Sequence, residues 1–263
     1  MFRLFFFFSF LSISCLGNQS NTATTQETTN IDTIKYSFKS IKKTSQYLAG
    51  EEDVLDTAYY SIKFPHFEKK EINDIIVGGI FIDGEENEDQ AAQSFIDGYN
   101  EFVEESSTKK LRYAWFKEVN TDILSISPLL ISLQTFVNEY TGGAHGNHYA
   151  IISNYDLNTQ KKIELAEMLL PNQFKNLTKI AEKHFRKQEN LDDSASLSKD
   201  FFFEDGIFAL NDNFGLTKKS LIIYYNEYEI KPYAEGPTTL EIPLNELDNI
   251  LSDRGKKYIQ SIN

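Results

Sequence analysis

The chain has 263 residues, of which 26 are basic and 39 acidic, so its formal net charge is −13. A chain of this length can bury one large core or two smaller ones. An acidic surface repels phosphate, which argues against binding to nucleic acids and favours either a cationic partner or simple solubility.

The N-terminal segment, MFRLFFFFSFLSISC, has the order of a secretory signal: one charge at Arg3, an apolar run, and small residues before Cys15. The apolar run is too short to span a bilayer as a permanent helix. The segment also resembles a bacterial lipoprotein signal, although Ser12 stands where that signal has leucine. An ordinary signal peptide followed by an unrelated cysteine is the alternative. We predict a signal peptide at residues 1–14 and a lipid anchor on Cys15 in a bacterial cell envelope.

Residues 15–32 are rich in Asn, Gln, Ser and Thr and have no apolar face to bury, so they predict a flexible tether. Cys15 is the only cysteine. If it carries a lipid, no thiol is left for a disulfide, and the extracytoplasmic part must be held together by its core alone.

The first half of the remaining chain predicts both strands and a helix. Strands are predicted at 34–47, 57–67, 111–120, 123–140 and 147–155. Pro65 is expected to interrupt the second of them. The spacing from Ala91 to Val103 gives one apolar helical face, preceded by acids that suit the helix dipole. Residues 72–82 are apolar but ambiguous, because two adjacent glycines weaken a helix.

In the second half, Pro171 and Asn172 open a predicted helix whose apolar stripe runs from Phe174 to Phe185. His184 on that stripe is interpreted as a packed or boundary histidine. Short strands are predicted at 221–225 and 239–242, with a final helix starting at 243–247. The pattern contains no internal repeat.

The stretch TGGAHGNH, residues 141–148, places three glycines and two of the four histidines between two predicted strands. A hairpin turn needs residues that tolerate positive φ, and sterics alone can account for Gly142, Gly143 and Gly146. His145 and His148 could share a metal only if the turn bent them together, and no cysteine ligand is available. We therefore predict neither a metal site nor a cofactor.

No nucleophile elbow, phosphate-binding loop, dinucleotide fingerprint or zinc-protease motif occurs in the sequence. These absences do not exclude an enzyme. The alternative to a binding protein is an envelope hydrolase that acts on cell-wall glycan, with His145 and a nearby carboxylate such as Asp156 as base and orienting group.

The motif TGGAHG at 141–146, followed by a strand and YDL, is similar to the signature of an extracytoplasmic family of unknown function. The family is typified by the lysozyme-binding domain of the RsiV anti-sigma factor and the N-terminal region of the PdaC peptidoglycan deacetylase. The runs 221–236 and 240–247 resemble its C-terminal motif, and YSIKFP at 60–65 resembles the smaller preceding domain. The resemblance covers about residues 33–250.

The resemblance implies an α+β fold with antiparallel sheets and packed helices, in two intimately associated subdomains at 33–108 and 109–263. It implies lysozyme binding in the best understood branch. The chain leaves no room for a membrane-spanning helix with a sigma-binding region or for a deacetylase domain, so we expect neither activity.

We therefore predict a lipid-anchored envelope protein that binds a lysozyme-like basic protein or peptidoglycan. The candidate ligand-binding residues are Thr141, Gly142, Gly143, His145, Tyr225, Tyr228 and Tyr233. The alternative for these tyrosines is packing within a sheet.

Overall fold

The computed structural model describes residues 26–31, 34–51, 54–106 and 113–262. The strands are β1 (Gln26–Ile31), β2 (Ile34–Glu51), β3 (Val54–Phe67), β4 (Phe116–Ile126), β5 (Leu130–Tyr140), β6 (Asn147–Asp156), β7 (Lys161–Lys162), β8 (Phe214–Leu216), β9 (Ser220–Tyr225) and β10 (Thr238–Pro243). The helices are α1 (Lys70–Ile80), α2 (Glu88–Glu105), α3 (Phe174–Gln188) and α4 (Asp253–Ile262). The predicted α+β class is confirmed.

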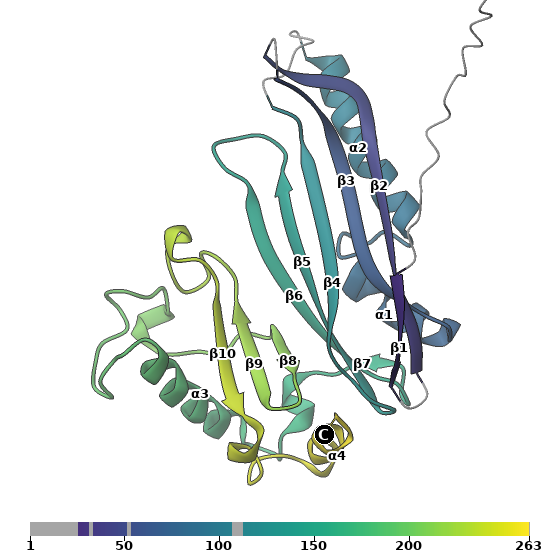
Figure 1. The fold of residues 1–263 in the computed structure, drawn as a ribbon. Helices are drawn as coiled ribbons and strands as arrows, with labels where there is room; N and C mark the ends of the chain where they lie inside the picture. The colour runs from purple at the N-terminus through teal and green to yellow at the C-terminus, as the bar shows by residue number, and fades with distance from the viewer. Residues whose placement is uncertain (1–25, 32–33, 52–53, 107–112, 263) are drawn as a thin grey trace, which may run out of the picture.

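Strands β1 to β7 form one sheet in sequence order. Neighbouring strands are antiparallel except β3 and β4, which are parallel. A parallel pair requires a crossover connection, and the segment holding α1 and α2 supplies it. Both helices lie against one face of the sheet (Figure 1). The predicted antiparallel pairing thus holds for every neighbouring pair of this sheet except β3 with β4, and the sheet is mixed.

The helix-covered face of the large sheet carries one apolar core. It is built from alternate residues of β3 and from the inner stripe of α1, including Ile62, Phe64, Ile72 and Ile76. Gly79 lets α1 approach the sheet closely, because a Cβ at this position would lie 2.5 Å from the hydroxyl of Tyr155. This contact explains one of the two adjacent glycines that made the segment ambiguous in sequence.

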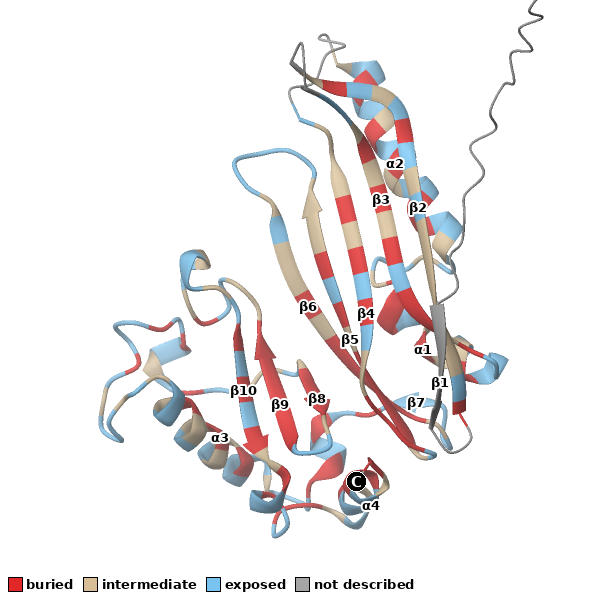
Figure 2. Ribbon diagram, viewed as in Figure 1, coloured by how far each residue is buried: buried red, intermediate tan, exposed pale blue. Residues whose placement is uncertain are grey.

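The C-terminal part of the chain forms a smaller lobe with its own core. Strands β10, β9 and β8 make a three-stranded antiparallel sheet, and α3 packs beside it (Figure 1). Leu177, Ala181 and Phe185 of the predicted stripe are buried in α3, whereas Phe174 at its start is 41% exposed. Every residue of the middle strand β9 is buried (Figure 2).

The two sheets meet along the outer edge of β6. Ala150 and Ile152 of β6 pack against Ile222 and Tyr224 of β9. The large sheet also runs without a break across the predicted boundary between 108 and 109, because β3 pairs with β4. The two predicted subdomains therefore share one sheet.

Three element boundaries differ from the sequence prediction. The predicted strand 123–140 is broken after Ile126, where the Ser127 hydroxyl accepts hydrogen bonds from the amides of Leu129 and Leu130 beside Pro128. Strand β8 is not among the predicted strands. The predicted helix start at 243–247 is only a single turn of 3-10 helix, and the last α-helix is α4.

Two differences concern the N-terminal region. Part of the predicted tether, Gln26–Ile31, forms β1 and pairs with β2. Pairing at the edge of a sheet uses backbone hydrogen bonds, so it does not require an apolar face on the strand. Strand β3 continues through Pro65. A proline is tolerated there because β3 pairs with β4 only as far as Lys63, so the missing N–H of Pro65 is not needed for that pairing. The predicted signal peptide and Cys15 lie outside the described residues. Within the described ranges, no helix has the length and apolar character needed to cross a membrane.

Candidate functional site

The stretch 141–146 joins β5 to β6 as the tip of a hairpin (Figure 1). Gly142 and Gly143 have φ of 111° and 95°, a region that L side chains rarely adopt. Gly146 is required for another reason: a Cβ there would lie 3.0 Å from the backbone oxygen of Glu139. The prediction that this motif reverses the chain is confirmed. Gly142 and Gly143 are needed for their positive φ, whereas Gly146 is needed because its backbone lies close to that of Glu139.

Four rings gather where this hairpin meets the loop after β9, and we call His145, His148, Tyr228 and Tyr233 the aromatic cluster. The imidazole of His145 stacks on the ring of Tyr233, with centroids 4.7 Å apart. His148 and Tyr228 also face Tyr233, at 6.4 Å and 5.5 Å. The turn thus brings both imidazoles to one phenol ring, which strand geometry alone did not predict.

His145 is fixed in orientation by its own loop. Its Nδ1 lies 2.7 Å from the backbone oxygen of Gly146. A carbonyl oxygen only accepts, so Nδ1 donates this bond and Nε2 is left as the second polar position of the ring. Tyr140 adds a bond from its hydroxyl to the backbone oxygen of Gly143, at 3.1 Å. Thr141, Gly142 and His145 are exposed. The hairpin tip therefore presents a held imidazole at the surface.

Tyr228 is an exposed member of the aromatic cluster, with 59% of its surface accessible. Its φ is +65°, which is unfavourable for an aromatic residue. The turn that imposes this φ is closed by a bond from the amide of Glu229 to the oxygen of Asn226, and the Asn226 amide donates to the Glu229 carboxylate at 2.7 Å. The chain thus holds a large apolar ring in solvent on a strained backbone.

Tyr225 is not part of this surface. It is 2% exposed, and its hydroxyl donates to the backbone oxygen of Ala209 at 2.7 Å. Its ring packs edge-on against Phe203, and burial raises the pKa of the phenol. A ligand on the surface cannot reach this side chain, so its inclusion among the contact residues is wrong. The packing interpretation holds for Tyr225 and Tyr224, whereas Tyr228 is exposed and Tyr233 is half-buried.

Acidic residues accompany the exposed rings. Glu227, Glu229 and Glu235 lie in the same loop as Tyr228 and Tyr233. The one lysine of this loop, Lys231, donates to Glu189 at 2.6 Å and is neutralised there. The loop therefore offers apolar rings in a negative field.

His145 and Asp156, the pair named as an example in the hydrolase alternative, do not come together. Asp156 is the last residue of β6, at the opposite end of the strand from the hairpin tip. At the usual rise per strand residue it therefore lies roughly 30 Å from His145. Its carboxylate already accepts hydrogen bonds from the Tyr258 hydroxyl at 2.5 Å and from Arg254 at 2.9 Å. Burial raises the pKa of Asp156, but these donors and two backbone amides outweigh it and lower the pKa to about 2. Asp156 cannot orient His145.

In the part of the chain that the structure describes, no three His, Cys, Asp or Glu side chains group closely enough to hold a metal ion. His184, the predicted boundary histidine, lies 3.1 Å from the carboxylate of Glu246 at the surface of α3.

The fold and the cluster define an α+β protein in which a helix-covered sheet and a smaller lobe jointly present exposed rings. Residues 49–148 match the family model "Deacetylase PdaC", and residues 166–245 match "Protein of unknown function (DUF3298)". The chain thus carries a PdaC N-terminal domain followed by a DUF3298 domain, as its motifs indicated. The aromatic cluster takes its histidines from the first match and its tyrosines from the second.

Two crystal structures share this fold. A DUF3298 family member from Bacteroides fragilis NCTC 9343 is 20% identical with a TM-score of 0.69, covering 93% of this chain and 99% of its own. A DUF3298 family protein from Pseudomonas aeruginosa PAO1 is 20% identical with a TM-score of 0.59, covering 81% and 94%. No curated protein matches the chain.

Sequence reasoning missed the polar residues that hold the two halves together. Asn213 and Asn226 donate and accept bonds at the outer edge of β6, to the backbone of Ala150 and Ile152, at distances of 2.7–3.1 Å. They occupy positions that a neighbouring strand would otherwise fill. Asparagines in loops are too common to signal this role, which depends on contacts between residues far apart in the chain.

Proposed function

We propose that this protein is a lipid-anchored binding protein of a bacterial cell envelope, and that its partner is a basic protein of the lysozyme type. The observation that carries the proposal is the exposed, strained Tyr228 within the aromatic cluster. Strained backbone persists where the surrounding structure enforces it, and such sites concentrate where function needs them. Rigid tyrosines are frequent anchors of protein interfaces.

The charge of the loop supports a basic partner. Carboxylates flank the exposed rings, while the single lysine of the loop is paired with Glu189. The net charge of −13 would speed the encounter with a cationic protein, and the rings would then provide the desolvated contact.

A titration with lysozyme at two salt concentrations tests this proposal. We expect binding at about 10 mM salt, where charges act over about 30 Å, and at least about tenfold weaker binding at 1 M, where they act over about 3 Å. The protein is prepared with Cys15→Ser, which removes the proposed lipid acceptor. Lack of binding at low salt would contradict the lysozyme version.

Two variants locate the contact. Tyr228→Ala and Tyr233→Ala should each weaken lysozyme binding by roughly tenfold, the loss typical of an interface anchor. Ile207→Ala is the control, because Ile207 is 68% exposed and lies outside the aromatic cluster. If all three variants bind alike, the cluster is not the contact surface.

A cell-wall glycan is the second candidate, favoured by the rings of His145 and Tyr228, which are inclined to the ring of Tyr233 by 27° and 30°. Such rings offer apolar faces together with hydroxyl and imidazole hydrogen-bonding groups. Soluble peptidoglycan fragments are the matched probe. Binding of fragments that depends on Tyr228 and is insensitive to salt would select the glycan over the basic protein.

The envelope location is tested separately. Wild-type protein should partition with membranes after expression in a bacterium that lipidates its exported proteins, whereas Cys15→Ser should be released in soluble form. Equal partitioning of the two would contradict the lipid anchor without bearing on the aromatic cluster.

A further inference from the structure

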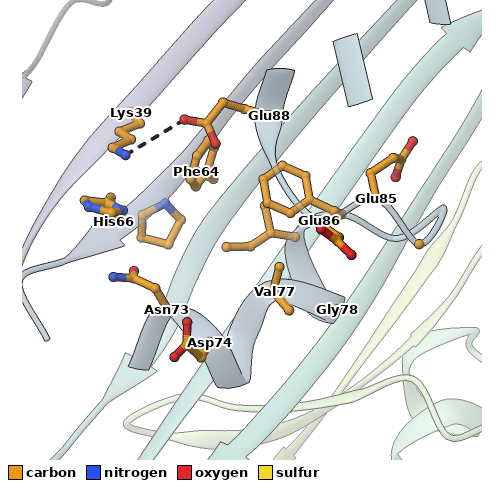
Figure 3. Close-up of a pocket in the computed structure, with 14 residues that line it drawn as sticks. Lys39, Phe64, His66, Asn73, Asp74, Val77, Gly78, Glu85, Glu86 and Glu88 are labelled. Carbon is orange, nitrogen blue, oxygen red and sulfur yellow. Dashed lines mark ion pairs between the residues drawn. The ribbon is translucent and has the colours of Figure 1, made fainter. Parts of the chain in front are cut away.

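A cavity of about 520 Å³ lies on the helix-covered side of the large sheet and shares no residue with the aromatic cluster. Its walls come from the end of β3, from α1 and from the loop between α1 and α2 (Figure 3). Small-molecule sites commonly fall in this range of volume. The cavity is therefore large enough for an organic ligand.

The base of the cavity is apolar. The rings of Phe64 and Phe81 meet edge to face with centroids 5.5 Å apart, and only 4% and 6% of their surfaces are exposed. Val77 and Pro65 extend this base. A ligand that enters must bring an apolar body to replace water here.

The rim of the cavity is negative. Lys39, its only lysine, lies 3.8 Å from the carboxylate of Glu88 (Figure 3). Within the described ranges, Glu85 and Glu86 have no ion-pair partner, and both border the opening. His66 also lines the wall; burial and the charge of Lys39 lower its pKa, with Glu88 acting in the opposite direction. The unpaired charge at the opening is thus that of two carboxylates.

Gly78 forms part of the cavity wall and keeps it open. It lies inside α1, where glycine costs about 1 kcal/mol relative to alanine. A Cβ at Gly78 would meet nothing within 4 Å, and its φ is not positive, so the fold does not require glycine there. The neighbouring Gly79 is required by its contact with Tyr155. Gly78 does border the cavity, and a side chain there would narrow it.

We propose that this cavity binds an amphipathic organic cation, with an apolar chain or ring on Phe64 and Phe81 and an ammonium or guanidinium group between Glu85 and Glu86. The carboxylates select the charge and the phenylalanines select the apolar body. An anionic amphiphile would meet uncompensated negative charge at the opening.

Calorimetric titration with octylammonium, octanoate and octanol tests the proposal. The three probes share one alkyl chain and differ in charge, so the order of their affinities reports the sign of the charge at the rim. We expect saturable binding of octylammonium, with octanoate at least about tenfold weaker and octanol between them. Equal affinity for octylammonium and octanoate, or no saturable binding of octylammonium, overturns the proposal.

Two variants place the probe in the cavity. Glu85→Gln combined with Glu86→Gln should weaken octylammonium binding several-fold and leave octanol unchanged. The matched control is Glu101→Gln combined with Glu105→Gln on α2, away from the cavity.

Gly78→Leu should abolish binding of all three probes while the unfolding temperature stays equal or rises, because the fold gains a better helix former. Retained binding in this stably folded variant overturns the assignment to the cavity. Neither result depends on the aromatic cluster, so the proposed function stands or falls separately.

Discussion

The imidazole of His145 stacks on the phenol of Tyr233 with their planes inclined by 27°, although the two residues fall within the matches of two different family models. One ring sits on a hairpin of the large sheet, and the other lies in the loop between β9 and β10 of the small sheet. The surface proposed to bind a partner therefore exists only when the two halves are assembled. Loss of their docking would scatter its four rings.

This stack predicts energetic coupling between the two loops. The variants His145→Ala and Tyr233→Ala should each lower the free energy of unfolding, and their effects should be non-additive by about 0.5–1.5 kcal/mol. Denaturant unfolding of the wild type, both single variants and the double variant gives the coupling. A control cycle with His145→Ala and Ile207→Ala should be additive. Additivity in the first cycle as well would show that the stack contributes nothing.

The strained φ of Tyr228 predicts a trade between stability and binding. Tyr228→Gly should stabilise the fold by about 0.5–1 kcal/mol, because relief of the left-handed conformation exceeds the added entropy of the unfolded chain. The same variant should lose binding of the partner. Gln160→Gly is the matched control, since Gln160 has φ of +56° and lies away from the aromatic cluster.

The Gln160→Gly control should gain stability and keep full binding. Thermal unfolding together with the lysozyme titration measures both quantities. If Tyr228→Gly binds as well as the wild type, the strained tyrosine has no part in recognition and the central support for the proposed function is removed.

Local signals in the sequence were enough for much of the fold. Helix α2 follows from the spacing of its apolar residues, and Asn87 caps its first turn by accepting a bond from the amide of Gln90. The hairpin tip follows from Gly142 and Gly143, because few other residues adopt their φ. These features depend on residues close together in the chain, where steric and periodic rules apply directly.

Features that depend on distant contacts were not predictable in this way. Tyr225 and Tyr228 look alike in the sequence, but β9 is the middle strand of the small sheet and is covered on both faces. Tyr224 packs toward the large sheet and Tyr225 toward the core beside α3. Successive side chains of β9 therefore point to opposite faces, and both faces are buried. Burial at these positions is decided by how the two sheets dock, which no local pattern encodes.

The asparagines at the edge of β6 predict where that docking is most sensitive. Asn213→Ala and Asn226→Ala should each lower the free energy of unfolding by about 1–3 kcal/mol, because the amides of Ile152 and Ala150 would lose their partners. Hydrogen exchange at those two amides should accelerate. Asn176→Ala is the control, since Asn176 is exposed and its side chain bonds only Gln173. Unchanged exchange at both amides would mean that water replaces the asparagines without cost.

The buried carboxylate of Asp156 predicts a defined loss of stability in acid. Its pKa is lowered from 3.8 to about 2, since bonds from Tyr258, Arg254 and two backbone amides outweigh the effect of burial. A depressed pKa means that the ionised group stabilises the fold above pH 4 and that this stabilisation is lost as the pH falls from about 4 to about 2. The shift corresponds to about 2 kcal/mol.

Urea unfolding of the wild type and Asp156→Asn at pH 7, 4 and 2 measures this contribution. The wild type should lose about 2 kcal/mol more than Asp156→Asn between pH 4 and 2, since the amide does not titrate. Asp122→Asn, at an exposed position of β4, should follow the wild type. If Asp156→Asn is too unstable to measure, Tyr258→Phe removes one donor and should reduce the same step. Parallel losses in all variants would show that α4 is not held to the sheet through an ionised Asp156.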